Sequence, residues 1–207
     1  MRTLISVLLL LGLGSVAAAT AATGFAKDQI IAQVERLGGK VDLDETQPSK
    51  PIVKIDLHAT KVTDAELMFL AKSKNALRQL RYLDLRLTHI GDSGAANLKD
   101  LTSLETLNLF RTQVGDEGLG YLKKLTELQT LLIGGTKVTD AGLANLKSMK
   151  KLKKLSLFQT QVTDACVPHL KALSKLEQLL ISGTKISDAG AQELLKALPR
   201  LRFSEST

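Results

Sequence analysis

Two kinds of side chain that could do chemistry recur along this sequence at a fixed spacing. Hydroxyls in a row are candidate nucleophiles, and carboxylates in a row are candidate calcium ligands, because Ca²⁺ binds through oxygen. The hydroxyls are Thr60, Thr88, Thr112, Thr136, Thr160 and Thr184. The carboxylates are Asp64, Asp92, Asp116, Asp140, Asp164 and Asp188. Each column advances by 24 residues, except for a first step of 28.

The aspartate column has a structural explanation that competes with a metal site. Each aspartate follows a threonine, glycine or serine, which are residue types that favour a helix N-cap. A negative charge also suits the first turn of a helix, and Thr63 with Glu66 has the spacing of a capping box. We therefore expect this column to cap helices, and the sequence implies no metal ion and no other cofactor.

The threonine column lacks a partner that could activate a hydroxyl. His58, His89 and His169 fall in three different columns of the repeat, and a hydroxyl nucleophile needs an adjacent base. The sequence therefore predicts a protein that is not an enzyme. The single cysteine, Cys166, excludes an intramolecular disulfide and replaces the glycine of its column. It is predicted to be a small buried hydrophobe, with a reactive thiol as the alternative.

Both columns belong to a longer repeat, L-x-x-L-x-L-x-x-T-x-V/I-x-D-x-G-L-x-x-L-x-x-L. Its six copies begin at Ile52, Leu80, Leu104, Leu128, Leu152 and Leu176. The first part resembles the leucine-rich repeat signature L-x-x-L-x-L-x-x-N/C, with threonine where asparagine or cysteine usually stands. The whole pattern is similar to the 24-residue leucine-rich repeats of exported bacterial proteins. It is also similar to the repeats of eukaryotic F-box proteins, but the sequence has no F-box.

The repeat pattern predicts an α/β solenoid. The second and third leucines of each copy alternate on one side of a short strand, and apolar residues at helical spacing follow the aspartate. The strands should form a parallel sheet on the concave face, with short helices on the convex face. A repeat cannot bury its leucines alone, so stacking must do it. We expect six repeats over residues 52–200 and an N-terminal helical cap.

The two ends of the chain have other compositions. Residues 1–23 resemble a cleavable signal peptide, with Arg2, an apolar stretch and then small residues; an uncleaved anchor is the alternative, and membrane attachment is expected only in that case. Residues 24–51 should be the cap, with a helix near 25–37 and a strand near 40–43. Residues 201–207 form a tail that begins a seventh strand. The protein is thus predicted to be exported, whether periplasmic, cell-surface or secreted.

A partner protein should meet the concave sheet through the outward columns at the third, fifth and seventh positions of each repeat. Aromatic residues and arginine dominate binding hot spots, and exposed apolar area marks interaction sites. The predicted partner-binding residues are Tyr82, Arg86, Phe110, Arg111, Leu132, Phe158 and Leu180. The resemblance likewise implies a non-enzymatic interaction scaffold. The alternative is that these side chains pack sideways along the sheet and only stabilise it.

The formal charge of +7 suggests a second surface. Lysines recur on the predicted convex helices at Lys99, Lys123, Lys147 and Lys171, and crowd at Lys147, Lys150, Lys151, Lys153 and Lys154. An envelope-associated structural protein that binds an anionic polymer is therefore an alternative function. A plain solvated helix face is the competing explanation. Nucleic acid is not expected, because no aromatic residues interleave the lysines as stacking platforms do.

Overall fold

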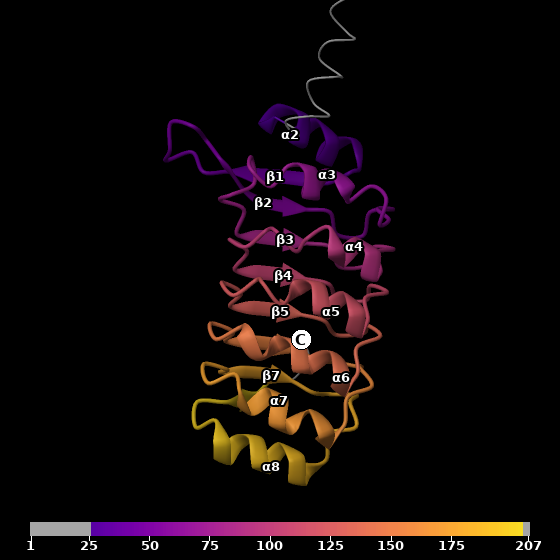
Figure 1. The fold of residues 1–207 in the computed structure, drawn as a ribbon, viewed down its shortest axis with the longest axis vertical. Coiled ribbons are helices and arrows are strands. Elements are labelled where there is room, and N and C mark those ends of the chain that lie inside the picture. Colours follow the sequence, from indigo (N-terminus) through magenta and orange to yellow (C-terminus); the bar gives the residue numbers. More distant parts are fainter. Residues whose placement is uncertain (1–25, 205–207) are drawn as a thin grey trace, which may run out of the picture.

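The structure, a computed structural model, describes residues 26–204. The predicted signal peptide lies outside these residues. Figure 1 shows one elongated stack in which the strands form a ladder and the helices follow one another beside it, from α2 at one end to α8 at the other. This is the predicted α/β solenoid.

The ladder is a single sheet in which the strands follow their order in the sequence. They are β1 (Lys40–Leu43), β2 (Ile52–Asp56), β3 (Tyr82–Asp84), β4 (Thr106–Asn108), β5 (Thr130–Leu132), β6 (Lys154–Ser156), β7 (Gln178–Leu180) and β8 (Arg202–Phe203). β1 is antiparallel to β2, and every later neighbour is parallel. Equivalent repeat positions pair across the sheet, for example Leu107 with Leu131. The columns of the sequence are therefore physical rows across the sheet.

The helical side is less regular than the sheet. Its elements are α2 (Lys27–Arg36), α3 (Met68–Lys72), α4 (Asp92–Ala96), α5 (Asp116–Leu122), α6 (Asp140–Leu143), η1 (Ala144–Ser148), η2 (Asp164–Cys166), α7 (Val167–Lys171) and α8 (Asp188–Ala197). The expectation that an aspartate begins every helix holds for α4, α5, α6 and α8. It is wrong for the first repeat, where Asp64 lies in a turn before α3, and for the fifth, where Asp164 begins a 3₁₀ turn.

The core is a continuous row of mainly leucine side chains that lies between the sheet and the helices. Leu83, Leu107, Leu131 and Leu155 lie in adjacent strands and are fully buried. α2 covers the first repeat, with Ile30 and Val34 also fully buried. Without that helix the outermost strand pair would expose its apolar side, which is why a repeat array needs a cap.

The threonine column fastens each turn to its own strand. In all six repeats the threonine hydroxyl donates a hydrogen bond of 2.6–2.8 Å to the carbonyl oxygen three residues earlier. The preceding residue has a positive φ in every repeat. These left-handed residues are Ala59, Leu87, Arg111, Gly135, Gln159 and Gly183. The threonine hydroxyls are therefore structural, and each one closes a left-handed turn.

The aspartate column has a different role from the predicted one. Asp140 accepts hydrogen bonds from the backbone N–H and the hydroxyl of Thr163, both at 2.8 Å, although Thr163 lies in the next repeat. Asp116 accepts both donors of Thr139 in the same way, and Asp164 both donors of Ser187. For Asp64 and Asp92 the residue at this position in the next repeat is a glycine, which donates only its backbone N–H. The expectation that these carboxylates cap their own helices is wrong. They tie the start of one helix to the start of the following one.

This tie explains the glycine column. A Cβ atom on Gly118 would lie 2.5 Å from Oδ1 of Asp92 in the preceding repeat, and one on Gly142 would meet Asp116. Cys166 occupies this column where the helix tightens into a 3₁₀ turn. Its side chain is buried, as predicted. Burial, with the nearby carboxylates of Asp140 and Asp164, raises the pKa of the thiol to about 12, which leaves it an inert packing group.

Candidate functional site

The N-terminal half of the concave face is a polar network centred on Asp84. Its carboxylate accepts hydrogen bonds from the Tyr82 hydroxyl at 3.2 Å, the Arg86 backbone N–H at 3.0 Å and the Asn108 amide at 3.3 Å. The Nε atom of Arg86 lies 3.5 Å from it. Asp84 is only 1% exposed, so the arginine compensates a buried charge.

The fifth column was predicted to face outward on the concave sheet, but three of its members are not exposed there. Asp84, Asn108 and Ser156 are buried. Asp84 and Asn108 are short side chains that turn back to accept the backbone N–H two residues further on, as such residues commonly do at turns. Strand alternation predicts which side a residue faces but does not show whether it turns back to its own backbone.

Asp56 and His58 form a second polar group at the first repeat. The Asp56 carboxylate lies 2.6 Å from Nδ1 of His58 and accepts that residue's backbone N–H at 3.0 Å. Burial would raise the pKa of Asp56, but the His58 hydrogen bonds and the charges of His58 and Lys54 outweigh it and leave the pKa lowered. Lys54 itself pairs with Asp42 at 3.1 Å and lies 5.3 Å from the centre of the Tyr82 ring.

Over repeats three to five the face carries an apolar patch that is built around two phenylalanines. The rings of Phe110 and Phe158 have centroids 6.2 Å apart and are tilted by 35°. They come from repeats three and five, and they can meet because Gly134 stands between them in repeat four. A Cβ atom there would lie 3.0 Å from Phe158 and 3.1 Å from Phe110. The Arg111 guanidinium lies 5.2 Å from the centre of the Phe110 ring.

The structure thus divides the predicted binding residues into two groups. Tyr82 and Arg86 gather at Asp84, whereas Phe110, Arg111 and Phe158 gather over Gly134. Leu132 and Leu180, in β5 and β7, are half-buried and extend the apolar part along the sheet. The Phe110–Phe158 pair does pack sideways, as the alternative explanation required, but both rings stay half-exposed and offer a surface as well.

Leu87 is a surface residue that the sequence reasoning missed. It follows Arg86, has a φ of 58° and is 46% exposed. An exposed leucine in a left-handed conformation is uncommon. No motif marks it, because left-handed geometry in a non-glycine residue is not visible in the sequence. Its exposed side chain adds apolar area at the turn that follows β3.

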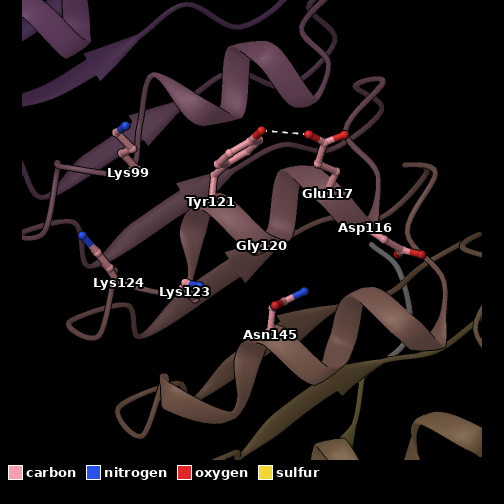
Figure 2. A pocket seen from close by; sticks show the side chains of 8 residues that line it. All are labelled: Lys99, Asp116, Glu117, Gly120, Tyr121, Lys123, Lys124 and Asn145. Atoms are coloured by element: carbon pink, nitrogen blue, oxygen red, sulfur yellow. Dashed lines mark hydrogen bonds between the residues drawn. The ribbon is translucent and has the colours of Figure 1, made fainter.

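The lysines of the convex side are unequally paired. Lys151 pairs with Glu127 at 2.5 Å, Lys171 pairs with Glu193, and Lys150 donates to a backbone carbonyl at 2.8 Å. Within residues 26–204, the side chains of Lys99 and Lys123 make no ion pair or hydrogen bond. Together with Lys124 they line an open hollow of about 440 Å³ on this side (Figure 2).

Two classes of site find no support in the described part of the chain. No group of three or more histidine, cysteine, aspartate or glutamate side chains is arranged to hold a metal ion between residues 26 and 204. In the same residues, no helix combines the length and the apolar character needed to cross a membrane.

The comparison with protein families decides the identity of the repeat. The family model described as "Leucine-rich repeat region" matches residues 57–204. The chain belongs to the leucine-rich repeat family. Families of this kind are typically non-catalytic. A search of curated proteins gives no match to this leucine-rich repeat protein.

Two solved structures with similar folds are internalins of Listeria monocytogenes. An internalin C2 (inlC2) has a TM-score of 0.56 at 25% identity, with 73% of this chain and 70% of that one covered. An internalin (inlF) has a TM-score of 0.51 at 21% identity, with 73% of this chain covered. The chain spans 46% of the length of that internalin. These likenesses confirm the fold of the leucine-rich repeat protein.

Proposed function

We propose that this leucine-rich repeat protein is a non-enzymatic scaffold that binds a partner protein on its concave sheet. The observation that carries the proposal is the apolar patch on that sheet. Two phenylalanine rings stay half-exposed over Gly134, beside the Arg111 guanidinium, on a sheet whose underside is fully packed. Aromatic and arginine side chains on a rigid support are typical of binding hot spots.

The two groups of side chains on this surface would contribute different kinds of contact to a partner. The side chains around Asp84 hold one another through hydrogen bonds, so they need little further ordering when a partner binds. A pre-ordered surface loses less conformational entropy on association. Tyr82 and Arg86 would then contribute fixed polar contacts, and Phe110, Phe158, Leu132 and Leu180 the apolar contacts.

We also infer that the protein works outside the cytoplasm. Residues 1–23 resemble a signal peptide, because Arg2 is followed by an apolar stretch and then by small residues. The partner sought is therefore a protein of the cell envelope or of the surroundings of the cell.

Site-specific photo-crosslinking tests the proposal, because it traps whichever protein lies against the chosen position. A photoreactive amino acid replaces Leu132 on the concave sheet in one variant and Lys147 on the convex side in a matched control. Irradiation of the producing cells should give a discrete covalent adduct from position 132 and none of that size from position 147.

A second variant connects the adduct to the apolar patch. Phe110→Ala together with Phe158→Ala, in the Leu132 photoreactive background, should abolish the adduct while the circular dichroism spectrum keeps its native form. An adduct of undiminished yield in the folded variant would contradict the proposed surface, and so would an identical adduct from position 147.

A further inference from the structure

The hollow on the convex side has features that the concave-sheet function does not use. We call it the convex hollow. Lys99, Lys123 and Lys124 lie along one side of it, Tyr121 and Gly120 belong to α5, and Asn145 comes from the next repeat. Figure 2 shows the Tyr121 ring between the lysines and the acidic side chains of α5. Cations, an aromatic ring and an amide thus share one open cavity.

Three lysines and two carboxylates line the convex hollow, so cations outnumber anions there. Within residues 26–204, the side chains of its three lysines make no hydrogen bond or ion pair, although Lys151 and Lys171 on the same side are each paired with a glutamate. The two carboxylates that line it are already engaged: Asp116 accepts two hydrogen bonds from Thr139, and Glu117 accepts one from Tyr121. The lysines therefore remain available to an anion from outside.

Tyr121 is held in place as an exposed platform. Its hydroxyl donates to Glu117 at 2.8 Å, and the residue is 36% exposed. The hydrogen bond and the charge of Glu117 raise the pKa of the phenol, although a tyrosine with its ordinary pKa of about 10 is already a donor at neutral pH. An aromatic ring with a fixed orientation gives an apolar face to pack on and a polar tip.

Gly120 keeps the floor of the convex hollow open. It lies inside α5, where glycine is less stable than alanine. A Cβ atom at this position would meet only the Asn145 amide, at 3.9 and 4.0 Å, so packing does not require glycine. The other repeats place Met68, Ala96, Ala144, Pro168 and Gln192 at this position. A less stable residue is thus found where a larger one would project into the cavity.

We propose that the convex hollow binds the acidic sugar units of an anionic polysaccharide. The apolar face of a sugar ring would pack on Tyr121 over Gly120, and its carboxylate would meet Lys99, Lys123 and Lys124. The Asn145 amide nitrogen donates to the Gly142 carbonyl at 3.2 Å, so its Oδ1 atom would accept a hydrogen bond from a sugar hydroxyl. This site lies on the opposite side of the protein from the concave sheet, so it is independent of the partner protein proposed above.

Isothermal titration calorimetry with three probes tests this assignment. The probes are an oligogalacturonate, a neutral glucose oligomer of the same length, and inorganic polyphosphate. Saturable binding is expected for the oligogalacturonate, with the neutral oligomer and the polyphosphate at least about tenfold weaker, because each lacks one of the two recognised features. Equal affinity for polyphosphate would overturn the sugar site, and so would an absence of oligogalacturonate binding.

Two sets of variants localise the binding. Replacing Lys99, Lys123 and Lys124 by glutamine should weaken oligogalacturonate about tenfold, since each exposed ion pair contributes modestly. A matched variant with glutamine at three lysines elsewhere, Lys61, Lys137 and Lys185, has the same net charge and should change affinity less than about twofold. Equal losses in the two variants would contradict a defined site.

The variant Gly120→Ala distinguishes an effect on ligand binding from an effect on the stability of the fold. Alanine in the helix should raise the melting temperature by about 2–4 °C, while its methyl group narrows the hollow and weakens oligogalacturonate several-fold. Stability and affinity therefore move in opposite directions. A variant that gains stability and binds oligogalacturonate as well as the wild type would refute the role given to Gly120 and with it the proposed hollow.

Discussion

Replacing Asp140 by alanine should destabilise the protein, because it removes the hydrogen bonds between repeats four and five. The carboxylate accepts two hydrogen bonds from Thr163, from the backbone N–H and from the hydroxyl, both at 2.8 Å. Hydrogen bonds to charged groups contribute about 1.5–3 kcal/mol each when they are shielded from solvent. Asp140 is half-exposed, so about 1 kcal/mol for each bond, or about 2 kcal/mol together, is a reasonable expectation.

The last aspartate of the column provides a matched control. Asp188 also begins a helix, α8, but within residues 26–204 its carboxylate accepts no hydrogen bond from another side chain or from a later repeat. Asp188→Ala therefore removes only the interaction with the helix dipole, worth about 0.5 kcal/mol. Asp140→Asn keeps one oxygen for the Thr163 N–H and should lie between the two alanine variants.

Thermal unfolding followed by circular dichroism measures these differences. In a protein of this size 1 kcal/mol corresponds to about 2–4 °C, so Asp140→Ala should lower the melting temperature by about 4–8 °C and Asp188→Ala by about 1–2 °C. Equal losses in the two variants would refute the tie between repeats. Calcium should change neither melting temperature, and a calcium-dependent shift of the wild type that Asp140→Ala abolishes would restore the metal-site interpretation.

Four further predictions follow from the same geometry. Gly142→Ala should cost about 1–3 kcal/mol, because its methyl group meets Asp116; in a double-mutant cycle with Asp116→Ala, measured by urea unfolding, the two losses should be less than additive. Leu87→Gly should stabilise the protein by about 0.5 kcal/mol, since relief of the left-handed conformation exceeds the entropy cost of glycine, and an unchanged or lower urea midpoint would contradict the strain. Cys166, with its pKa raised to about 12, should not react with a thiol reagent at pH 8 until the protein is unfolded. The hydrogen bonds from Ser187 lower the pKa of Asp164. The stability that they contribute is therefore complete above the ordinary aspartate pKa, and it is lost as the pH falls through the lowered pKa. In unfolding measurements between pH 7 and pH 3, the free energy of unfolding should decline less for Asp164→Asn than for the wild type.

The sequence was sufficient to predict the sheet and the core. Six aligned copies repeat the same spacing, so a position such as Leu107 is identified as inward-facing by its five counterparts as well as by its neighbours. The threonine hydrogen bond was predictable for a related reason. Donor and acceptor lie three residues apart in one turn, and local contacts of this kind depend little on how repeats stack.

Contacts between repeats were much harder to predict. The partner of Asp140 lies 23 residues later, and it comes within reach only when two repeats are superposed with the correct offset. The burial of Asp84 depends likewise on Tyr82, Arg86 and Asn108 closing around it. The pairing of Phe110 with Phe158 has a sequence signal in hindsight, since Gly134 interrupts the column between them.

The path of the chain around α5 was beyond sequence reasoning altogether. A lysine column was visible, but a solvated helix face and a binding hollow have the same pattern of charges. A binding hollow differs from a solvated face in two ways. Its carboxylates are already hydrogen-bonded within the protein, as Glu117 is to Tyr121, and the glycine at position 120 leaves space for a ligand. Both depend on side-chain packing between neighbouring repeats.

The tie between successive repeats also bears on how such a protein changes its length. Each 24-residue unit carries an acceptor, its aspartate, for the unit after it, and a donor together with a small residue for the unit before it. After an in-frame duplication or deletion of one unit, every contact between neighbouring units therefore still has both its acceptor and its donor, as Asp116 and Thr139 are now. Recombination can lengthen or shorten the array in whole units, and the interacting surface then changes in steps of one strand.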